Sequence, residues 1–294
     1  MEKNKPIIVG VGELLWDFLP TGKRAGGAPI NLVYHSTQMG AEGYAISAVG
    51  KDDLGDEIIE ELQKNHIANN LSIVEHPTGK VDVALKEGIP AYTIVEGVAW
   101  DYIPLTEESV SLVKRADAVC FGSLALRSEV SRETILSLLD QANKDAIRFF
   151  DINIRQSYYS KELIEQLLQK SNVLKINDEE LLLLRDMFHW EGTDQEVCHK
   201  ILSDYQLKYV ILTAGGNFSS IYSSSEESTI STPKVKVADT VGAGDSFSGA
   251  FIYSILTGSS LREAHQKAVD IAAFVRSEER RVGKECRSRW SPYH

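Results

Sequence analysis

VADTVGAGDSFSGAF occupies residues 237–251 and is the most informative stretch of the chain. A loop rich in Gly and Ala opens directly into an apolar helix, which we expect to run to about Thr257. The first turn of a helix carries N–H groups that have no partner inside the helix, at the positive end of the helix dipole. Small side chains let an anion come close to that backbone. The stretch therefore predicts an anion-binding turn at Gly242, Ala243 and Gly244.

Asp245 lies in the same turn. A carboxylate beside an anion site makes little sense as a stabilising feature, because like charges repel each other. It suits a general base that takes a proton from a hydroxyl group while the turn holds a phosphoryl group in transit. A tight turn with a capping Asp is the alternative when Gly-x-Gly-Asp is taken alone.

A second glycine-rich motif lies far away in the chain. GGAPIN at residues 26–31 is followed by Gly40 and by VGKDDLG at residues 49–55. Together the two motifs resemble the signatures of the PfkB (ribokinase-like) sugar kinases, G-G-x-x-x-N and D-T-x-G-A-G-D, and the resemblance runs from about residue 7 to residue 275. It implies a kinase that uses ATP and Mg²⁺. It also implies a three-layer α/β/α fold, doubly wound around a mainly parallel sheet, with a small β-sheet lid.

Short apolar runs alternate with amphipathic helical patterns along the chain. Continuous apolar strands between such helices favour a parallel sheet that is covered on both faces. We expect strands at Ile7–Val11, Tyr44–Val49, Ala118–Phe121, Arg148–Ile152, Val173–Ile176 and Tyr209–Thr213. We expect helices at Ile30–Met39, Gly55–Asn65, Ser131–Asn143, Lys161–Gln169, Asp178–Phe188, Thr193–Tyr205 and Leu261–Val275, besides the helix of Asp245.

Two stretches break this alternation. Leu14–Leu19 extends the first strand, and Lys80–Tyr102 alternates like half-buried strands around a turn at residues 88–90. We expect them to form a small sheet outside the main one. In the resembled family such a sheet is a lid over the sugar and often a dimer surface, which places a lid at about 14–25 and 80–102 and implies a homodimer through it. An ordinary hairpin is the alternative.

The sugar is expected near the carboxyl end of the first strand, where ligands bind in open α/β sheets. Asp17 follows that strand, and the family places a sugar-binding Asp at the matching position. The Gly26-Gly27 pair lets the backbone approach a polyol, and the amide of Asn31 can donate to hydroxyl groups and accept from them. Arg155 closes another strand and could hold a phosphate or a sugar oxygen, with an ion pair to Asp151 as a nearly equal alternative.

The nucleotide is expected at two further motifs. Asn177 and Glu180 match the family's N-x-x-E, and their oxygen atoms suit Mg²⁺, held through water molecules. The same pattern also describes an N-cap followed by an acidic first turn. Thr213 and Gly215 match the family's T-x-G near the nucleotide, whereas Ser219 stands where the family usually has another Gly. The adenine-side loop is therefore expected to differ in shape.

Asp239 and the carbonyl group of Val241 match positions that coordinate a monovalent cation, such as K⁺, in many members of the family. Residues 276–294, RSEERRVGKECRSRWSPYH, are basic and have no apolar period. They resemble a translated sequencing adapter, with a disordered basic tail as the alternative. We expect a native kinase domain at 1–275, a non-native tail at 276–294, and a cation site that lacks its C-terminal part.

Composition narrows the class of protein. The chain has 294 residues, of which 43% are hydrophobic, and this suits one large domain. The net charge of −11 argues against a nucleic-acid partner. The apolar runs are too short to span a membrane, and we expect a cytoplasmic protein whose partners are a small sugar and ATP. Binding of anionic ATP then requires a local positive potential.

Several functions compete. Gly10 and Gly12 suggest a dinucleotide-binding dehydrogenase, but Leu15 stands where that fingerprint needs a third Gly. An inactive sugar-binding protein is the alternative if the C-terminus is truncated. Among the kinases, GGAPxN after GExxxD looks like the fructokinases, while the motif of Asp151 and Arg155 makes a 2-keto-3-deoxygluconate kinase the second candidate. We expect transfer of the ATP γ-phosphoryl group to the C6 hydroxyl of D-fructose.

Overall fold

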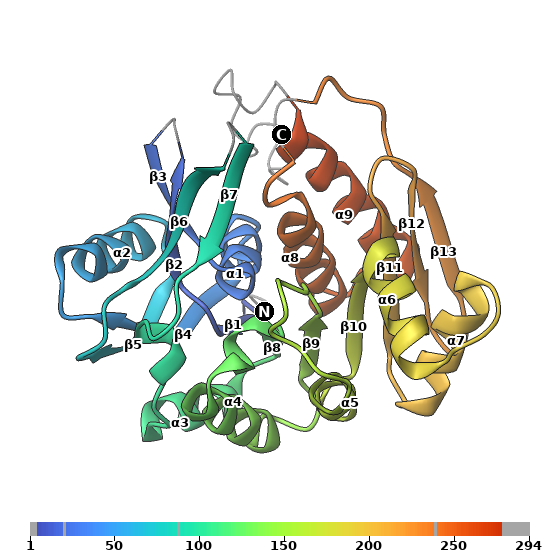
Figure 1. The fold of residues 1–294 in the computed structure, drawn as a ribbon. Helices are drawn as coiled ribbons and strands as arrows, with labels where there is room; N and C mark the ends of the chain where they lie inside the picture. The colour runs from blue at the N-terminus through green and yellow to red at the C-terminus, as the bar shows by residue number, and fades with distance from the viewer. Residues whose placement is uncertain (1–4, 20–21, 87–88, 238–239, 278–294) are drawn as a thin grey trace, which may run out of the picture.

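Alternating strands and helices build one large sheet in this computed structural model, which describes residues 5–19, 22–86, 89–237 and 240–277 (Figure 1). The strand order is β13-β12-β11-β10-β9-β8-β1-β4-β5, and only the β11–β12 and β12–β13 pairs are antiparallel. The strands are β1 (Ile7–Val11), β4 (Glu42–Gly50), β5 (Ala68–Val74), β8 (Ala118–Phe121), β9 (Ile147–Asp151), β10 (Val173–Asn177), β11 (Tyr209–Ala214), β12 (Phe218–Tyr222) and β13 (Glu227–Ser231).

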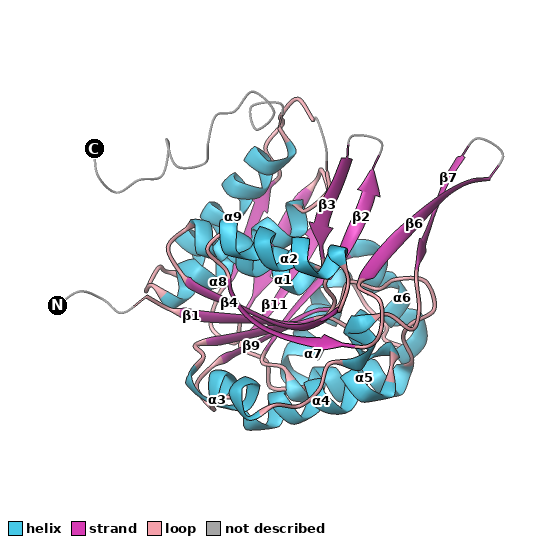
Figure 2. Ribbon diagram, turned by 90° about the vertical axis from the view of Figure 1, so that its left-hand side faces the viewer, coloured by secondary structure: helices cyan, strands magenta, loops and turns pink. Residues whose placement is uncertain are grey.

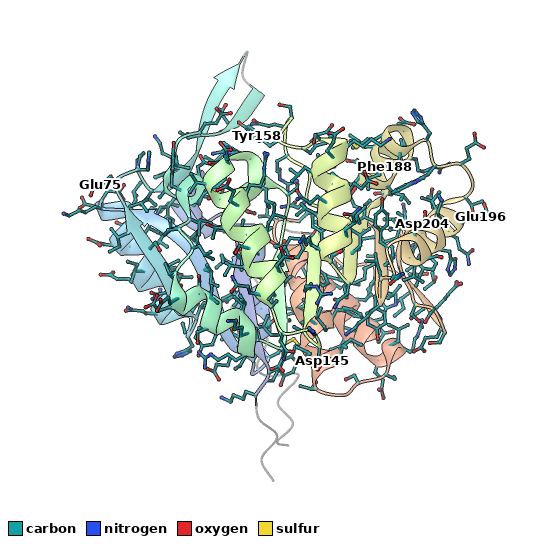
Figure 3. All side chains as sticks on the ribbon, turned by 90° about the horizontal axis from the view of Figure 1, so that it is seen from below. Glu75, Asp145, Tyr158, Phe188, Glu196 and Asp204 are labelled. Atoms are coloured by element: carbon teal, nitrogen blue, oxygen red, sulfur yellow. The ribbon has the colours of Figure 1, made fainter. Side chains whose placement is uncertain are left out.

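Helices cover both faces of this sheet, and each face has its own apolar core. On one face the core residues come from α3 (Glu107–Arg115), α4 (Glu129–Gln141), α5 (Lys161–Lys170), α6 (Asp178–Phe188) and α7 (Asp194–Asp204). Figure 3 shows α4 and α5 side by side on this face. On the other face they come from α1 (Ala28–Gln38), α2 (Asp53–Lys64), α8 (Ala243–Leu256) and α9 (Leu261–Arg276). The predicted doubly wound α/β fold is confirmed.

Successive residues of the parallel strands point to opposite faces and are apolar on both, as a sheet covered on both sides requires. Ile8 packs into one core, whereas Val9 and Val11 pack into the other. The strands predicted at Ile7–Val11 and Ala118–Phe121 and the helix predicted at Asp178–Phe188 have those bounds, and the other predicted elements of the main domain shift by a few residues at their ends.

Some elements were not predicted from the sequence. β5, β12 and β13 carry several Asn and Ser residues and lack a continuous apolar run, although their backbones complete the sheet. α3 begins at Glu107 with a capping box from Thr106, a signal that the apolar pattern alone did not show.

A second sheet stands apart from the main one (Figure 2). Its order is β3-β2-β6-β7, and the β2–β6 pair is its parallel one. The strands are β2 (Leu15–Leu19), β3 (Gly22–Gly26), β6 (Gly79–Lys86) and β7 (Ile89–Ile94). The predicted small sheet is therefore confirmed. Its roles as a lid over the sugar and as a dimer surface stay predictions.

The predicted extent of this sheet needs a correction. Its strands end at Ile94, and residues 99–102 form the 3-10 helix η1 (Ala99–Tyr102) instead. Trp100 is fully buried in the main core, and the guanidinium group of Arg127 lies 3.9 Å from the centre of its ring. Arg127 also pairs with the buried Asp101 at 2.8 Å. These contacts hold η1 in the main domain, so it does not belong to the small sheet.

The C-terminal helix α9 ends at Arg276, one residue beyond the predicted end, and Ser277 pairs with Val237 through an isolated bridge. The predicted non-native tail lies, from residue 278 onward, outside the described residues. Within the described ranges no helix is both long and apolar enough to cross a membrane.

His265 links helix α9 to the antiparallel strands β12 and β13 at the edge of the sheet. Its side chain is fully buried, with Nε2 2.8 Å from Ser219 Oγ in β12 and Nδ1 2.8 Å from Ser228 Oγ in β13. Burial, with a smaller contribution from the charge of Arg262, lowers the pKa of His265 to about 4. The neutral imidazole is thus the form that the fold requires.

Replacing His265 with Asn should remove a pH-dependent part of the stability. In the unfolded chain the imidazole takes up its proton near pH 6.5, whereas in the fold it does so only near pH 4. Wild type should therefore lose its advantage over His265→Asn as the pH falls through that window, by up to about 3 kcal/mol. Urea denaturation at several pH values measures this. A constant difference in stability between wild type and His265→Asn would contradict the assignment.

Candidate functional site

Polar side chains gather at the carboxyl ends of the parallel strands. Glu13 follows β1, Asp151 ends β9, Asn177 ends β10, and Thr213 lies at the end of β11. The strand order reverses at β1, which pairs with β4 on one side and β8 on the other. Crevices at such a reversal are the usual ligand sites of open α/β sheets.

The predicted anion-binding turn begins helix α8 above this edge. Gly242 is the N-cap with a left-handed backbone (φ 77°), and within the described residues no side chain caps the helix. Ala243 N donates to Thr240 O at 3.3 Å, so this N–H is shared with the turn itself. Gly244 and Asp245 follow in the first helical turn. A ligand anion would therefore find an N-terminus that no side chain of its own satisfies.

Asp245 contacts the other glycine-rich motif directly. Asn31 Nδ2 donates to Asp245 Oδ2 at 2.9 Å, across 214 residues of sequence. Burial and the negative charge of Asp151 raise the pKa of Asp245 to about 6, against the lowering effects of Asn31 and Lys175. Such a carboxylate is ionised at neutral pH and is more basic than an ordinary Asp, as a general base should be.

Lys175 is a site residue that sequence reasoning missed. It lies in β10, and its Nζ is 2.7 Å from Asp151 Oδ2, with both side chains about nine-tenths buried. Burial alone would lower the pKa of Lys175, but the charges of Asp151, Glu180 and Asp245 raise it, so the group is a buried cation. A Cβ placed on Gly244 would lie 3.4 Å from this Nζ. The ammonium group therefore lies beneath the predicted anion-binding turn.

A signal for Lys175 was present in the sequence. A lysine within the apolar run VLKIN is unusual, because lysine is rarely buried unless it is paired. The same contact corrects one alternative for Arg155. Asp151 forms its ion pair with Lys175, whereas Arg155 is exposed and its Nη1 donates to the carbonyl of Ile154 at 2.9 Å.

Asn177 and Glu180 form a capping box at the start of α6. Glu180 N donates to Asn177 Oδ1 at 2.8 Å, and Asn177 N donates to Glu180 Oε2 at 3.0 Å. Glu180 Oε1 accepts from Ile154 N at 3.0 Å. Burial and the charge of Asp151 raise the pKa of Glu180. The capping role is thus present, and the contact of Glu180 with Mg²⁺ stays a prediction.

One cavity of about 400 Å³ joins the nucleotide motifs. Asn177 and Thr213 are neighbours across β10 and β11 and both line it. An apolar side of its wall is formed by Phe218, Phe247, Val269, Ala272 and Ala273. The other lining residues are polar, charged or small: Asp178, Glu179, Gly215, Gly216, Ser219, Thr232, Thr240, Ala243, Gly244 and Arg276. An apolar wall beside the turn of α8 suits a flat base whose phosphates reach the turn. Ser219 itself lies in β12 and not in a loop.

The predicted sugar residues lie at the small sheet. Asp17 in β2 is half-buried, and burial raises its pKa. Gly26 lies so close that a Cβ there would be 2.5 Å from Asp17 Oδ2. Gly27 has a positive φ of 127°, and a Cβ on it would be 2.1 Å from the carbonyl oxygen of Glu13. Gly27 is therefore required for close packing of the start of α1 against the segment after β1.

Glu13 is a second residue that sequence reasoning did not assign. Only 2% of it is exposed, and its Oε1 accepts from Ala28 N at 3.1 Å. The available signal was the dipeptide Gly-Glu directly after an apolar strand, a place where a carboxylate has to be explained.

The described residues offer few groups that could bind the predicted metal ions. Among the described residues no group of three or more His, Cys, Asp or Glu side chains is arranged to hold a metal ion. Asp239 of the predicted monovalent-cation site lies outside the described residues, and Val241 is 65% exposed. A K⁺ site therefore stays a prediction.

Comparisons with known proteins agree with the motifs. The model of the pfkB family carbohydrate kinases matches residues 19–281. The chain is 28% identical to "Probable fructokinase-5" of Arabidopsis thaliana, over 92% of this chain and 89% of the relative. It is 28% identical to 5-dehydro-2-deoxygluconokinase 2 of Bacillus cereus, over 82% and 76%. The crystal structure of an uncharacterized sugar kinase of Pyrococcus horikoshii in complex with ATP superimposes with a TM-score of 0.77 at 26% identity, covering 90% and 91%. The resemblance to the family is confirmed.

Replacing Gly27 with Ala should destabilise the fold by more than about 3 kcal/mol, because the new Cβ combines a disfavoured backbone with a backbone clash. Gly216→Ala is the matched control, since no heavy atom of the described residues lies within 4 Å of its Cβ position. The control should change the stability by less than about 0.5 kcal/mol. Thermal unfolding of both purified variants measures the difference, and equal melting temperatures would refute the packing argument.

Proposed function

The chain belongs to the pfkB family of carbohydrate kinases, and we propose that it transfers the γ-phosphoryl group of ATP to the C6 hydroxyl of D-fructose. It is a phosphotransferase that acts on a sugar hydroxyl. The observation that carries the proposal is the hydrogen bond of 2.9 Å between Asn31 and Asp245. It brings the sugar motif and the phosphoryl-binding motif to one point, where a hydroxyl group and a phosphate can meet.

The proposed chemistry assigns each group a task. Asp245 accepts the proton of the C6 hydroxyl, while the oxygen atom attacks the γ-phosphorus in line with the departing ADP. The backbone N–H groups of Gly242, Ala243 and Gly244 hold the transferring group. The buried ammonium of Lys175 below the turn adds positive charge where negative charge develops. Closure of the small sheet would exclude water as a competing acceptor.

Mg²⁺ fits this arrangement as a partner of the nucleotide. Glu180 keeps lone pairs beyond its two backbone contacts, and hard oxygen ligands of this kind hold Mg²⁺ through water. The ion would neutralise phosphate charge when bound. Asn177 and Thr213 line the same cavity and would lie beside the phosphates.

Fructose is favoured by the GGAPxN motif at residues 26–31 and by the similarity to the Arabidopsis relative. Arg155 supports a second candidate, a keto-deoxy sugar acid such as 2-keto-3-deoxygluconate. The positive charge of its exposed guanidinium group lowers the pKa values of Glu13 and Asp245, so this charge acts on the proposed site. A substrate carboxylate could pair with it.

A substrate panel tests the proposal. ADP release with fructose, ribose and 2-keto-3-deoxygluconate should be greatest with fructose. A preference for the sugar acid that disappears in Arg155→Gln would establish the second candidate. Sugar binding without any ADP release would instead identify an inactive sugar-binding protein.

Replacing Asp245 with Asn keeps the shape of the side chain and removes the base. Positioned bases contribute roughly 10²–10⁴-fold, so kcat should fall by about that factor, while calorimetric binding of fructose should hardly change. Near-full turnover of this variant would show that Asp245 is not the base.

Replacing Asp17 with Ala should weaken the binding of the sugar and leave the binding of ATP nearly unchanged. Loss of a charged hydrogen-bond partner costs about 1.5–3 kcal/mol, or roughly ten- to a hundredfold in the KM for fructose. The KM for ATP should stay within about twofold. Asp204, an exposed residue labelled in Figure 3, gives the matched control Asp204→Ala, which should alter neither constant. An equal effect of Asp17→Ala on both substrates would place Asp17 outside the sugar site.

A further inference from the structure

Glu13 is a buried carboxyl group with one unsatisfied oxygen. It lies between β1 and β2, and only 2% of the residue is exposed. Oε1 accepts from Ala28 N, whereas Oε2 has no hydrogen-bond partner among the described residues. Burial of a carboxyl group in this state is costly. A smaller neutral side chain that accepted the same hydrogen bond would cap the helix at a lower cost of burial.

The hydrogen bond from Ala28 N to Glu13 Oε1 lies at the start of helix α1. Helix α1 begins after Gly27, which has no side chain to cap the helix, so Glu13 supplies the acceptor from another segment. The same turn carries Asn31, whose backbone N–H bonds to Gly27 O at 2.9 Å and whose side chain holds Asp245. The carboxyl group of Glu13 is therefore linked to the proposed base through one helical turn.

Two charged groups act on Glu13 from other elements. Arg155, from the segment after β9, favours its ionised form, and Asp245, from α8, disfavours it. Coupling between two titrating groups is reciprocal, so an ionised Glu13 must also make Asp245 more basic.

We propose that Glu13 is a positioning residue for phosphoryl transfer: it holds the first turn of α1, with Gly27 and Asn31, against the sugar, and its negative charge strengthens Asp245 as a base. The proposal rests on the proposed sugar-kinase function. No bond to Glu13 forms or breaks in the reaction. The hydroxyl proton goes to Asp245, and the charge on Glu13 stabilises the protonated form of Asp245.

The proposal makes the activity sensitive to pH. Burial raises the pKa of Glu13 to about 7, against the lowering effects of its backbone hydrogen bonds and Arg155. Above that pH Glu13 is ionised and supports both the turn and the base. As the pH falls, Glu13 takes up its proton first and Asp245, with a pKa of about 6, takes up the second. The acid limb of kcat/KM for the sugar should therefore involve two protons.

The decisive measurement follows the carboxyl carbon of Glu13 by NMR in a full-length chain labelled at its glutamate carboxyl groups, with Glu13→Gln for assignment. Glu13→Gln keeps an acceptor for Ala28 N and removes the charge. Glu13 titrates while Asp245 is still ionised, so Asp245→Asn, which removes that neighbouring charge, should lower the pKa of Glu13 by about half a unit to one unit. The surface variant Asp204→Asn should leave the pKa of Glu13 unchanged. An unaltered Glu13 titration in folded Asp245→Asn would overturn the proposal.

Kinetics supply the second readout. In Glu13→Gln the acid limb should involve one proton and lie at lower pH, and kcat above pH 8 should fall about three- to tenfold because the base is weaker. Glu13→Ala, which also removes the cap, should raise the sugar KM by about tenfold more, with the KM for ATP unchanged. If Glu13→Gln does not fold, the acid limb of kcat/KM in the wild-type enzyme provides the test. An acid limb that involves only one proton would contradict the proposal. If no sugar yields ADP, the proposed function fails, and the NMR titration still tests the coupling.

Discussion

Three carboxylates and one ammonium group share the carboxyl edge of the main sheet, and the balance between them underlies the whole site. Asp151 pairs with Lys175 at 2.7 Å, and the charges of Glu180 and Asp245 act on the same lysine. Without this buried cation the ionised carboxylates would repel one another and take up protons. Breaking a buried pair by removing one partner costs about 3–5 kcal/mol, so the fold and the state of Asp245 depend on the same contact.

This balance also explains how an acidic chain can receive ATP. A net charge of −11 opposes the approach of a nucleotide. The local field at the site differs from the average, because the N-terminus of α8, the ammonium of Lys175 beneath Gly244 and the guanidinium of Arg155 all lie at one edge. Under the proposed function, Asp245 can then act as a base beside the candidate anion-binding turn, since the surrounding positive charge offsets the repulsion.

Local sequence patterns predicted much of the fold of this protein. The parallel sheet, its covering helices, the small second sheet and the capping box at Asn177 and Glu180 all follow from spacing and residue type, because strands, helices and caps are read over a few neighbouring residues. The patterns did not predict β5, which lacks a continuous apolar run. They also did not predict η1, whose position depends on the contact of Trp100 with Arg127. Each failed where packing between distant segments overrides local preference.

The sequence by itself determined the family, the motifs and the identity of Asp245 as the candidate base, since these are properties of contiguous residues. The tertiary structure decided which groups meet. It joined Asn31 to Asp245 across 214 residues, paired Lys175 with Asp151 in place of Arg155, and buried Glu13 against the turn that follows Gly27. The pKa of a group depends on burial and on neighbouring charges. Both arise only when separate strands bring their carboxyl ends to one edge, so no reading along the chain could supply them.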